Sequence, residues 1–453
     1  MAQKIAITIS EGSVARNILR SGVLEHLLQK GGVKVFLLTF ADKVDLYKEE
    51  FGGENVEIIG FPKNMLPTFF DRMLNFLCRN CFYTETLVSV QRTRYAEDRN
   101  FVYFFLKQAL IKTLGRMSLI HRVIRFIAST RKPVSPLKEA FVRIQPNLLF
   151  VTDVQDDLDL HAIAVAKTQQ VKVIGMVRSW DNLTNALVQV VLPKLFVGNE
   201  YIAWRATTIQ HVPPDTAQIV GMPQYDVFFC REGIVSREEF LKSQGIDPKN
   251  KLVLFCATGT YFMPYEWEIP LMIQRAIDEG RLPKDTAIIA RRHPNFPPSS
   301  EITGSKVYFD RSVSYYTNGS MSNWELGRQD IYHFANLMTH ADVVVVGYSS
   351  ITIDAAVFDR PVVNVAFDGP HDTPYDKSAR RGYEVYSHYI ALIKTGGAHV
   401  AWSEEEMVEW IGKYLNDPTL DREGRRKLRE DFITFEDGKS AERIASAILE
   451  LAR

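Results

Sequence analysis

Short apolar runs alternate with amphipathic segments along most of this chain. The clearest runs are four to six residues long and rich in Val, Ile and Leu: Lys4–Ile9, Val35–Leu38, Leu252–Ala257 and Val343–Val346. Runs of this kind suit parallel strands that are buried on both faces. Segments with helical spacing of apolar residues follow them, which is the rhythm of repeated βαβ units. The pattern therefore predicts an α/β fold made of two Rossmann-like domains.

The segment 66–140 interrupts this rhythm and is predicted to be a helical insertion. It is rich in aromatic residues, and between Val88 and Lys138 it holds eleven Lys and Arg residues against two acidic residues. A basic, aromatic pair of helices can lie on an anionic membrane surface. The same residues can instead form a small core beneath a solvated basic face. Both interpretations stay open at this point.

Length and composition set the domain boundaries. At 453 residues the chain is too long for one ordinary core, so two domains are expected. We predict an N-terminal domain over 1–229 that contains the insertion, a polar linker over 230–250, and a C-terminal domain over 251–453. Basic and acidic residues balance at 54 each, so nothing in the overall charge indicates a nucleic-acid partner.

The N-terminus and the cysteines indicate a compartment. The opening residues MAQKIAITISEG lack the apolar core of a signal peptide. No apolar run reaches the roughly 18 residues that a membrane-spanning helix needs. The four cysteines are too few and too scattered for a disulfide framework. We therefore expect a cytoplasmic protein, with peripheral contact to the inner face of the membrane through 66–140 as the alternative.

Residues 341–362 (ADVVVVGYSSITIDAAVFDRPV) carry the most distinctive candidate chemistry. Gly347 ends the apolar strand, and Ser349 and Ser350 stand where the N-cap of the next helix belongs. Free N–H groups and the positive end of the helix dipole gather there, which favours a bound anion. Asp354 lies one turn into the helix and can reach past bound phosphates to a ribose diol. A nucleotide-diphosphate site and an ordinary capped turn both fit the stretch.

Positive charge collects at the end of a second predicted strand, Thr286–Ala290. The strand runs into Arg291, Arg292 and His293, and Pro294 holds the chain extended after them. Two guanidinium groups beside a histidine suit a pyrophosphate.

Acidic side chains follow two predicted strands of the N-terminal half. Glu11 lies in the loop after the first strand, and Asp181 lies in the loop RSWDNLTNA after the strand VKVIGMV. In parallel sheets the carboxyl ends of the strands are the usual place for a ligand. Asp181 can equally be the N-cap of a short helix beside a packed Trp180. The first loop lacks a G-x-G-x-x-G fingerprint, so dinucleotide binding is not indicated.

The order of motifs in the second half resembles that of the CDP-glycerol glycerophosphotransferase family, within the GT-B glycosyltransferases. The matching pieces are short and degenerate, and their order is the specific feature: His293-Pro294, Tyr348-Ser349-Ser350 with Asp354, Arg360-Pro361, Arg381-Gly382-Tyr383 and Asp437-Gly438-Lys439-Ser440. The resemblance covers the chain from 252 onward. It implies a GT-B fold with a nucleotide-donor domain over 251–453 and an acceptor domain over 1–229.

The resemblance also implies roles for individual residues. His293 and the Ser349-Ser350 turn would contact the phosphates of the donor, and Asp354 its ribose or nearby hydroxyls. The full set of nucleotide-binding candidates is Arg291, Arg292, His293, Gly259, Thr260, Tyr348, Ser349, Ser350, Thr352 and Asp354. GT-B sites as a rule need no metal, so neither a metal nor a cofactor is expected besides the nucleotide-diphosphate donor, which is a substrate.

The predicted function is transfer of a sugar or polyol phosphate from a nucleotide-diphosphate donor to a surface-glycan or lipid-linked acceptor. His293 would neutralise the leaving diphosphate. A base must deprotonate the acceptor hydroxyl, and Asp181 and then Glu11 are the candidates. Two alternatives use the same frame: a nucleotide-sugar 2-epimerase, and a non-catalytic GT-B-like protein that binds nucleotide or glycan. The long basic and aromatic segment 66–140 favours transfer, because an epimerase needs no second substrate.

Overall fold

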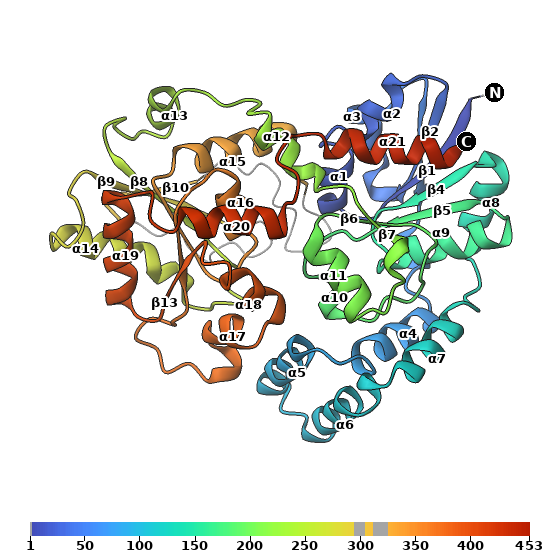
Figure 1. Ribbon diagram of the computed structural model, residues 1–453, viewed down its shortest axis with the longest axis horizontal. Helices are drawn as coiled ribbons and strands as arrows, with labels where there is room; N and C mark the ends of the chain where they lie inside the picture. The colour runs from blue at the N-terminus through green and yellow to red at the C-terminus, as the bar shows by residue number, and fades with distance from the viewer. Residues whose placement is uncertain (1, 294–303, 311–324) are drawn as a thin grey trace. The chain divides into compact units, whose positions relative to one another are not determined.

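The computed structural model describes residues 2–293, 304–310 and 325–453 (Figure 1). The chain forms two compact units: unit 1 comprises Met1–Asp226 and Ile433–Arg453, and unit 2 comprises Val227–Phe432. Each unit has a parallel β-sheet with helices packed on it. This confirms the predicted α/β fold with two Rossmann-like domains.

Unit 1 has a sheet of seven strands in the order β3-β2-β1-β4-β5-β6-β7. The strands are β1 (Gln3–Ile9), β2 (Val33–Phe40), β3 (Val56–Phe61), β4 (Leu148–Val151), β5 (Lys172–Met176), β6 (Leu195–Val197) and β7 (Ala217–Ile219). The helices between consecutive strands are α1 (Gly12–Ile18), α2 (Val23–Gln29), α3 (Val44–Phe51), α8 (Ser135–Ile144), α9 (Asp157–Thr168), α10 (Asn182–Asn185) and α11 (Glu200–Thr208). The strand order reverses between β1 and β4, which is where sheets of this kind bind ligands.

Four further helices follow β3 and pack around a small core of their own. They are α4 (Phe69–Asn80), α5 (Glu85–Asp98), α6 (Phe101–Lys112) and α7 (Ser118–Ala128). Their shared core includes Leu74, Cys78, Phe82, Ile111 and Ile124. Within unit 1, α5 and α6 lie away from the sheet, and α4 and α7 run between them and the sheet (Figure 1).

The final helix, α21 (Ser440–Ala452), belongs to unit 1 and packs beside α2. Its apolar residues recur at helical spacing, and Ile444 and Ile448 are fully buried in the same core as Ile5 of β1. The Ala441 N–H, in the first turn of α21, donates to Asp226 Oδ2 at 2.7 Å. The C-terminal domain was expected to run to residue 453. In the structure, residues 433–453 belong to unit 1 instead, because this amphipathic helix buries its apolar face there.

In the part of unit 2 that the structure describes, six strands form a sheet in the order β10-β9-β8-β11-β12-β13. The strands are β8 (Lys251–Cys256), β9 (Thr286–Arg291), β10 (Val307–Phe309), β11 (Val343–Val346), β12 (Val362–Val365) and β13 (His399–Ala401). Its helices are α13 (Arg237–Ser243), α14 (Ile269–Asp278), α15 (Arg328–His340), α16 (Ile351–Val357), α17 (Arg380–Glu384), α18 (Ser387–Ile393), α19 (Glu404–Asn416) and α20 (Arg422–Phe432), and α12 (Asp226–Phe229) lies at the passage from unit 1. The strand order reverses between β8 and β11.

The predicted linker over 230–250 is part of unit 2. Phe240 and Leu241 of α13 are buried in the core of unit 2 together with Leu252 and Leu254 of β8. The segment is polar because only one side of α13 is buried. Within the described ranges, no helix combines the length and the apolar character that crossing a membrane requires.

Candidate functional site

The predicted nucleotide-binding segments of unit 2 follow three neighbouring strands. His293 follows β9, Gly259 follows β8, and Ser349 follows β11, and these strands pair in parallel in the order β9-β8-β11. Parallel strands present their carboxyl ends at one edge of the sheet. The structure therefore brings these segments, which are distant in sequence, to one edge of unit 2.

The loops after β8 and β11 are bonded to each other. The Gly347 N–H donates to Thr258 Oγ1 at 3.1 Å, and the Tyr348 hydroxyl donates to the Phe262 carbonyl at 3.1 Å. A side chain at position 347 would overlap Met263 and Thr258, so only glycine allows this approach. This contact between the loops places Ser349 and Ser350 at the carboxyl end of β11, where Ser349 is half-buried and Ser350 is exposed.

A buried carboxylate occupies part of the loop that was expected to bind phosphate. Glu266 accepts the Thr258 N–H at 2.5 Å and the Gly259 N–H at 2.9 Å. Burial raises the pKa of Glu266 to about 8, although these backbone hydrogen bonds lower it. Gly259 was expected to contact the donor, but the carboxyl group of Glu266 already accepts its N–H. Thr260 follows in the same loop and is half-buried.

Two other predicted contacts also point into the protein interior. The Arg291 guanidinium pairs with Asp310 at 2.6 Å, and both side chains are buried. Thr352 is fully buried, with its Oγ1 2.9 Å from the Tyr389 hydroxyl and 3.0 Å from the Asn364 amide. The sequence pattern could not reveal these partners because they lie on other elements. Neither side chain is available to a nucleotide in this structure.

His293 and Arg292 remain at the end of β9. Burial lowers the pKa of His293 to about 4, so its imidazole is neutral at pH 7. It can therefore offer a phosphate one N–H donor but no positive charge. Arg292 is half-buried, and its guanidinium lies over the ring of Phe309 at 5.2 Å. Arg292 therefore supplies a positive charge at this end of β9.

The Arg381-Gly382-Tyr383 motif supports the β11 loop from behind. A side chain at Gly382 would overlap the ring of Tyr348, so the glycine allows the two elements to touch. The Tyr383 hydroxyl donates to the Val365 carbonyl of β12 at 3.0 Å. The motif therefore positions Tyr348, a role that its sequence alone did not indicate.

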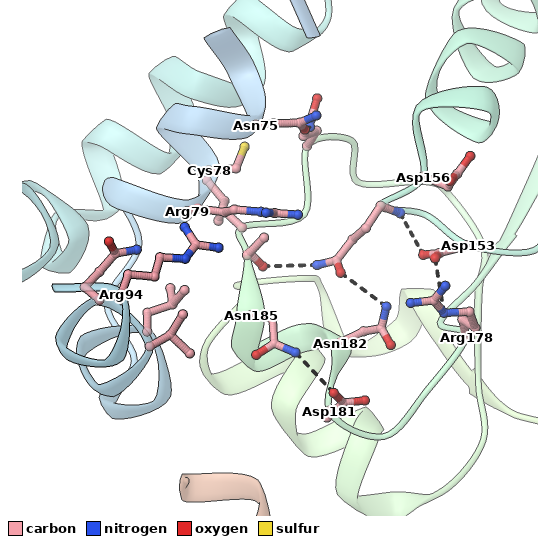
Figure 2. A pocket seen from close by; sticks show the side chains of 17 residues that line it. Asn75, Cys78, Arg79, Arg94, Asp153, Asp156, Arg178, Asp181, Asn182 and Asn185 are labelled. Atoms are coloured by element: carbon pink, nitrogen blue, oxygen red, sulfur yellow. Dashed lines mark hydrogen bonds and ion pairs between the residues drawn. The ribbon is translucent and has the colours of Figure 1, made fainter. Parts of the chain in front are cut away.

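Unit 1 contains a polar pocket with a volume of about 450 Å³ (Figure 2). It lies between α4 and α5 on one side and the loops after β4 and β5 on the other. Its charged lining residues balance in sign: Arg79, Arg94, Arg178, Asp153, Asp156 and Asp181. Its amides are Asn75, Gln91, Gln155, Asn182, Asn185 and Gln189. In Figure 2, Arg79 and Arg94 extend from α4 and α5 toward the loops that carry the carboxylates.

Both predicted bases belong to this region, and they differ in their contacts. Asp181 lines the pocket and accepts hydrogen bonds from Ser179 Oγ at 2.7 Å and Asn185 Nδ2 at 3.2 Å. Glu11 forms an ion pair with Arg178, which also contacts Asp153 at 3.3 Å. Arg178 thus joins the ends of β1, β4 and β5. Asp181 stands at the N-cap position of α10, as the alternative interpretation expected, but its side chain makes no capping hydrogen bond there.

Asp153 and Asp156 also line the pocket, and they lie between β4 and α9. Asp156 does accept the Leu158 N–H at 2.8 Å as the N-cap of α9. However, burial and then the charge of Asp153 raise the pKa of Asp156 to about 7. Burial also raises the pKa of Asp153, although the charge of Arg178 lowers it. Among the described residues, no group of three or more His, Cys, Asp or Glu side chains is arranged to hold a metal ion.

Solved structures with a similar fold show the architecture of the chain. The chain is similar to the UDP-GlcNAc 2-epimerase from Neisseria meningitidis bound to UDP-GlcNAc, at 12% identity and a TM-score of 0.58, over 99% of this chain and 100% of that one. It is similar to the UDP-GlcNAc 2-epimerase from Methanocaldococcus jannaschii, at 14% identity and a TM-score of 0.54, over 99% and 100%. It is also similar to the wall teichoic acid polymerase TagF, at 10% identity and a TM-score of 0.51, over 99% and 89%. These likenesses define a two-domain fold of the GT-B type.

The family follows from the sequence. Residues 157–450 match the family of CDP-Glycerol:Poly(glycerophosphate) glycerophosphotransferase, which is well over half of the chain. This protein therefore belongs to the CDP-glycerol glycerophosphotransferase family, a family of transferases, as its motifs predicted. No curated protein matches it by sequence.

Proposed function

We propose that this protein transfers a sugar or a polyol phosphate from a nucleotide-diphosphate donor to a surface-glycan or lipid-linked acceptor. The observation that carries the proposal is the meeting of the His293, Thr260 and Ser349 segments at one edge of the unit 2 sheet. Family membership supports a transferase of the glycerophosphotransferase kind.

In this proposal the donor binds to unit 2. Arg292 supplies positive charge to the diphosphate, and the neutral His293 imidazole donates one hydrogen bond to it. The hydroxyls of Ser349 and Ser350 donate to the same phosphates, and Asp354 accepts from the ribose. Groups that are fixed before the reaction stabilise the charge of the leaving diphosphate without rearranging.

The acceptor binds in the pocket of unit 1. Carboxylates and side-chain amides suit the hydroxyls of a glycan or polyol, and they form most of the lining. Arg79 and Arg94 suit a phosphate on the same acceptor. Asp181 is the proposed base, because it faces the cavity and keeps its carboxylate fixed through Ser179 and Asn185. Glu11 is less suited, because Arg178 holds its charge.

A nucleotide-sugar 2-epimerase is the second candidate, since proteins with that name share the fold. The separate polar pocket of unit 1 favours transfer, because an enzyme that acts on one substrate does not need an acceptor site. Formation of a new sugar epimer without any acceptor would reverse this preference. We also propose a cytoplasmic location, which fits four free cysteines in a reducing compartment.

Nucleotide binding tests the proposal first. The full chain is screened by thermal shift against CDP, CMP, UDP, GDP, ADP and dTDP. A ligand that binds only the folded state stabilises it by about 2.7 kcal/mol at a hundred times its dissociation constant. We expect one nucleotide to raise the melting temperature, and His293→Ala and Asp354→Ala to reduce that rise.

The control is Asp417→Ala, which removes an exposed carboxylate from the same unit. Its melting temperature should rise with nucleotide as much as that of the parent. If no nucleotide shifts the melting temperature of the parent, the donor site is wrong. If the His293 and Asp354 variants respond fully, nucleotide binds elsewhere.

A further inference from the structure

The pocket of unit 1 takes much of its wall from residues 181–189, which we call the pocket loop. Six of the 17 residues that line the pocket belong to this loop: Asp181, Asn182, Asn185, Ala186, Leu187 and Gln189 (Figure 2). The single turn of α10 accounts for only four residues of the loop. The other backbone N–H and C=O groups of the loop must therefore find partners on other elements.

Gln210 supplies several of these partners. Its Oε1 accepts the Val188 N–H at 2.8 Å, and its Nε2 donates to the carbonyls of Leu183 at 2.7 Å and Ala186 at 2.9 Å. The Gln210 side chain is fully buried, and it lies outside the set of described residues that line the pocket. One amide group thus joins α10 to the segment after it without reaching the pocket.

Arg125 of α7 holds the same loop from the helical layer. Its Nε donates to the Val188 carbonyl at 3.0 Å, and one terminal nitrogen donates to the Gln210 carbonyl at 2.5 Å. A guanidinium group offers its donors in a rigid fork, which suits two carbonyl oxygens at a fixed separation. Arg125 and Gln210 therefore bond to each other and hold both backbone polar groups of Val188.

Asp181 moves with the loop because it is bonded to α10. The Thr184 hydroxyl donates to the Asp181 carbonyl at 2.7 Å, and Asn185 Nδ2 donates to Asp181 Oδ2 at 3.2 Å. The Thr84 hydroxyl, at the start of α5, donates to the Thr184 carbonyl at 2.8 Å. A displacement of the loop would therefore displace the Asp181 carboxylate.

We infer that Gln210 and Arg125 are positioning residues of the acceptor site, which hold the pocket loop and thereby fix Asp181. The inference rests on the proposed function for the role of Asp181 as the base, whereas the hold on the loop rests on the hydrogen bonds alone. Both residues act through the loop, because neither lines the pocket among the residues described there. Misplacing a reacting group by about 1 Å can lower a rate by about 10²-fold.

Cys78 reports the position of the loop without any activity assay. It lines the pocket, its side chain is 1% exposed, and its carbonyl accepts the Leu187 N–H at 3.0 Å. Burial raises the pKa of its thiol to about 12, so the thiol reacts slowly while the loop is closed. The full chain is alkylated with iodoacetamide at mildly alkaline pH, and mass spectrometry follows each cysteine. We expect Cys78 to be labelled at least about tenfold faster in Gln210→Met and in Arg125→Met, because the loop opens more often.

Two controls separate opening of the loop from general loosening of unit 1. Cys81 belongs to the same small core as Cys78 but does not line the pocket, so its labelling rate should rise less. Gln108→Met removes a buried amide that donates to the Val88 carbonyl at 3.1 Å, away from the loop. This variant should be labelled like the parent.

Steady-state kinetics tests whether the hold on the loop serves the reaction. The probe pair is CDP-glycerol with poly(glycerophosphate), after which the family is named. Gln210→Met and Arg125→Met should lower kcat by about 10–10²-fold and leave KM for the donor unchanged, because the proposed donor site is in unit 2. Arg125→Lys keeps the charge and one donor for the Val188 carbonyl, so it should recover part of kcat and show an intermediate rate of Cys78 labelling.

Three outcomes would overturn the inference. Cys78 is labelled at the parent rate in both methionine variants, or Cys81 is labelled faster by the same factor as Cys78. Alternatively, Cys78 becomes reactive while kcat stays at the parent value. Melting temperatures check that each variant is folded, and Arg125→Lys decides if the methionine variants unfold. A parent that shows no transfer would count against the proposed function, and the labelling would then decide the inference by itself.

Discussion

At the scale of single residues, Glu266 shows how one buried carboxylate can shape a loop. It accepts N–H groups of Thr258 and Gly259 and so fixes the turn after β8. Glutamate has a usual pKa of 4.5, and burial raises the pKa of Glu266 to about 8 in the folded protein. Between those pH values the unfolded chain has lost this proton while the folded chain keeps it. The free energy of unfolding should therefore fall as pH rises through this window.

Glu266→Gln should remove this pH dependence while keeping an oxygen that accepts the loop N–H groups. We expect the variant to gain stability relative to the parent as pH rises from about 5 to 8. Urea unfolding at both pH values, followed by a signal from unit 2, measures the difference. Glu239→Gln changes an exposed glutamate of unit 2 and should show no such trend. If the free energy of unfolding changes with pH equally in the parent and in Glu266→Gln, the prediction is contradicted.

Asp181 and Glu11 can be distinguished by one isosteric change in each. If Asp181 is the base, Asp181→Asn should lower kcat by about 10²–10⁴-fold, which is the usual contribution of a general base. Nucleotide binding to unit 2 should be unchanged, because Asp181 lies in unit 1. Glu11→Gln should cost less, since Arg178 already holds that carboxylate. Steady-state kinetics measures both changes. A larger loss of kcat for Glu11→Gln than for Asp181→Asn would make Glu11 the base instead of Asp181.

At the scale of elements, Asp71 connects α4 to two other parts of unit 1. It is fully buried, pairs with Arg131 at 2.9 Å, and contacts His161 of α9 at 2.9 Å. With Thr68 it forms a capping box at the start of α4. Arg131 in turn donates to Gln189, which lines the pocket. The network therefore links the helical layer to the candidate acceptor site.

Asp71→Asn should destabilise unit 1 by about 3–5 kcal/mol, because it leaves the buried Arg131 without its anion. Burial alone would raise the pKa of Asp71, but the hydrogen bonds from His161 and Thr68 hold it well below its usual range. Its contribution is therefore present above pH 4, roughly its usual pKa, and is lost as pH falls further. Urea unfolding across this range measures the effect. The control is Asp45→Asn, which changes an exposed residue on α3. An equal loss of unfolding free energy in both variants would refute the prediction for Asp71.

At the scale of the whole molecule, local patterns predicted more than long-range contacts did. Strands such as Val343–Val346 were evident as buried apolar runs, and their order placed the Ser349 and His293 segments at one edge of the unit 2 sheet. The sequence could not show that Asp310 neutralises Arg291 or that Glu266 occupies the loop after β8, because these contacts join separate elements. For the same reason it missed the pocket, whose walls come from α4, α5 and two loops.

The domain boundary was wrong for a related reason, and it gives a prediction for the whole chain. Residues 251–453 look like one domain in sequence, but Ile444 and Ile448 of α21 are buried in the core of unit 1. Removing 433–453 uncovers this core, and each fully buried isoleucine contributes about 1.5–3 kcal/mol. Domains are stable by only about 5–15 kcal/mol, so unit 1 should then unfold or aggregate.

Unit 2 offers the matched comparison. A fragment of residues 227–432 keeps its complete sheet and should fold and bind the same nucleotide as the full chain. A fragment of 251–453 loses the buried Phe240 and Leu241 of α13 and carries α21 without its core, so it should be less stable. Circular dichroism melting of the two fragments decides between these boundaries. If the 251–453 fragment is the more stable, then α13 is not part of the folding unit of unit 2, and the boundary at 226–227 is wrong.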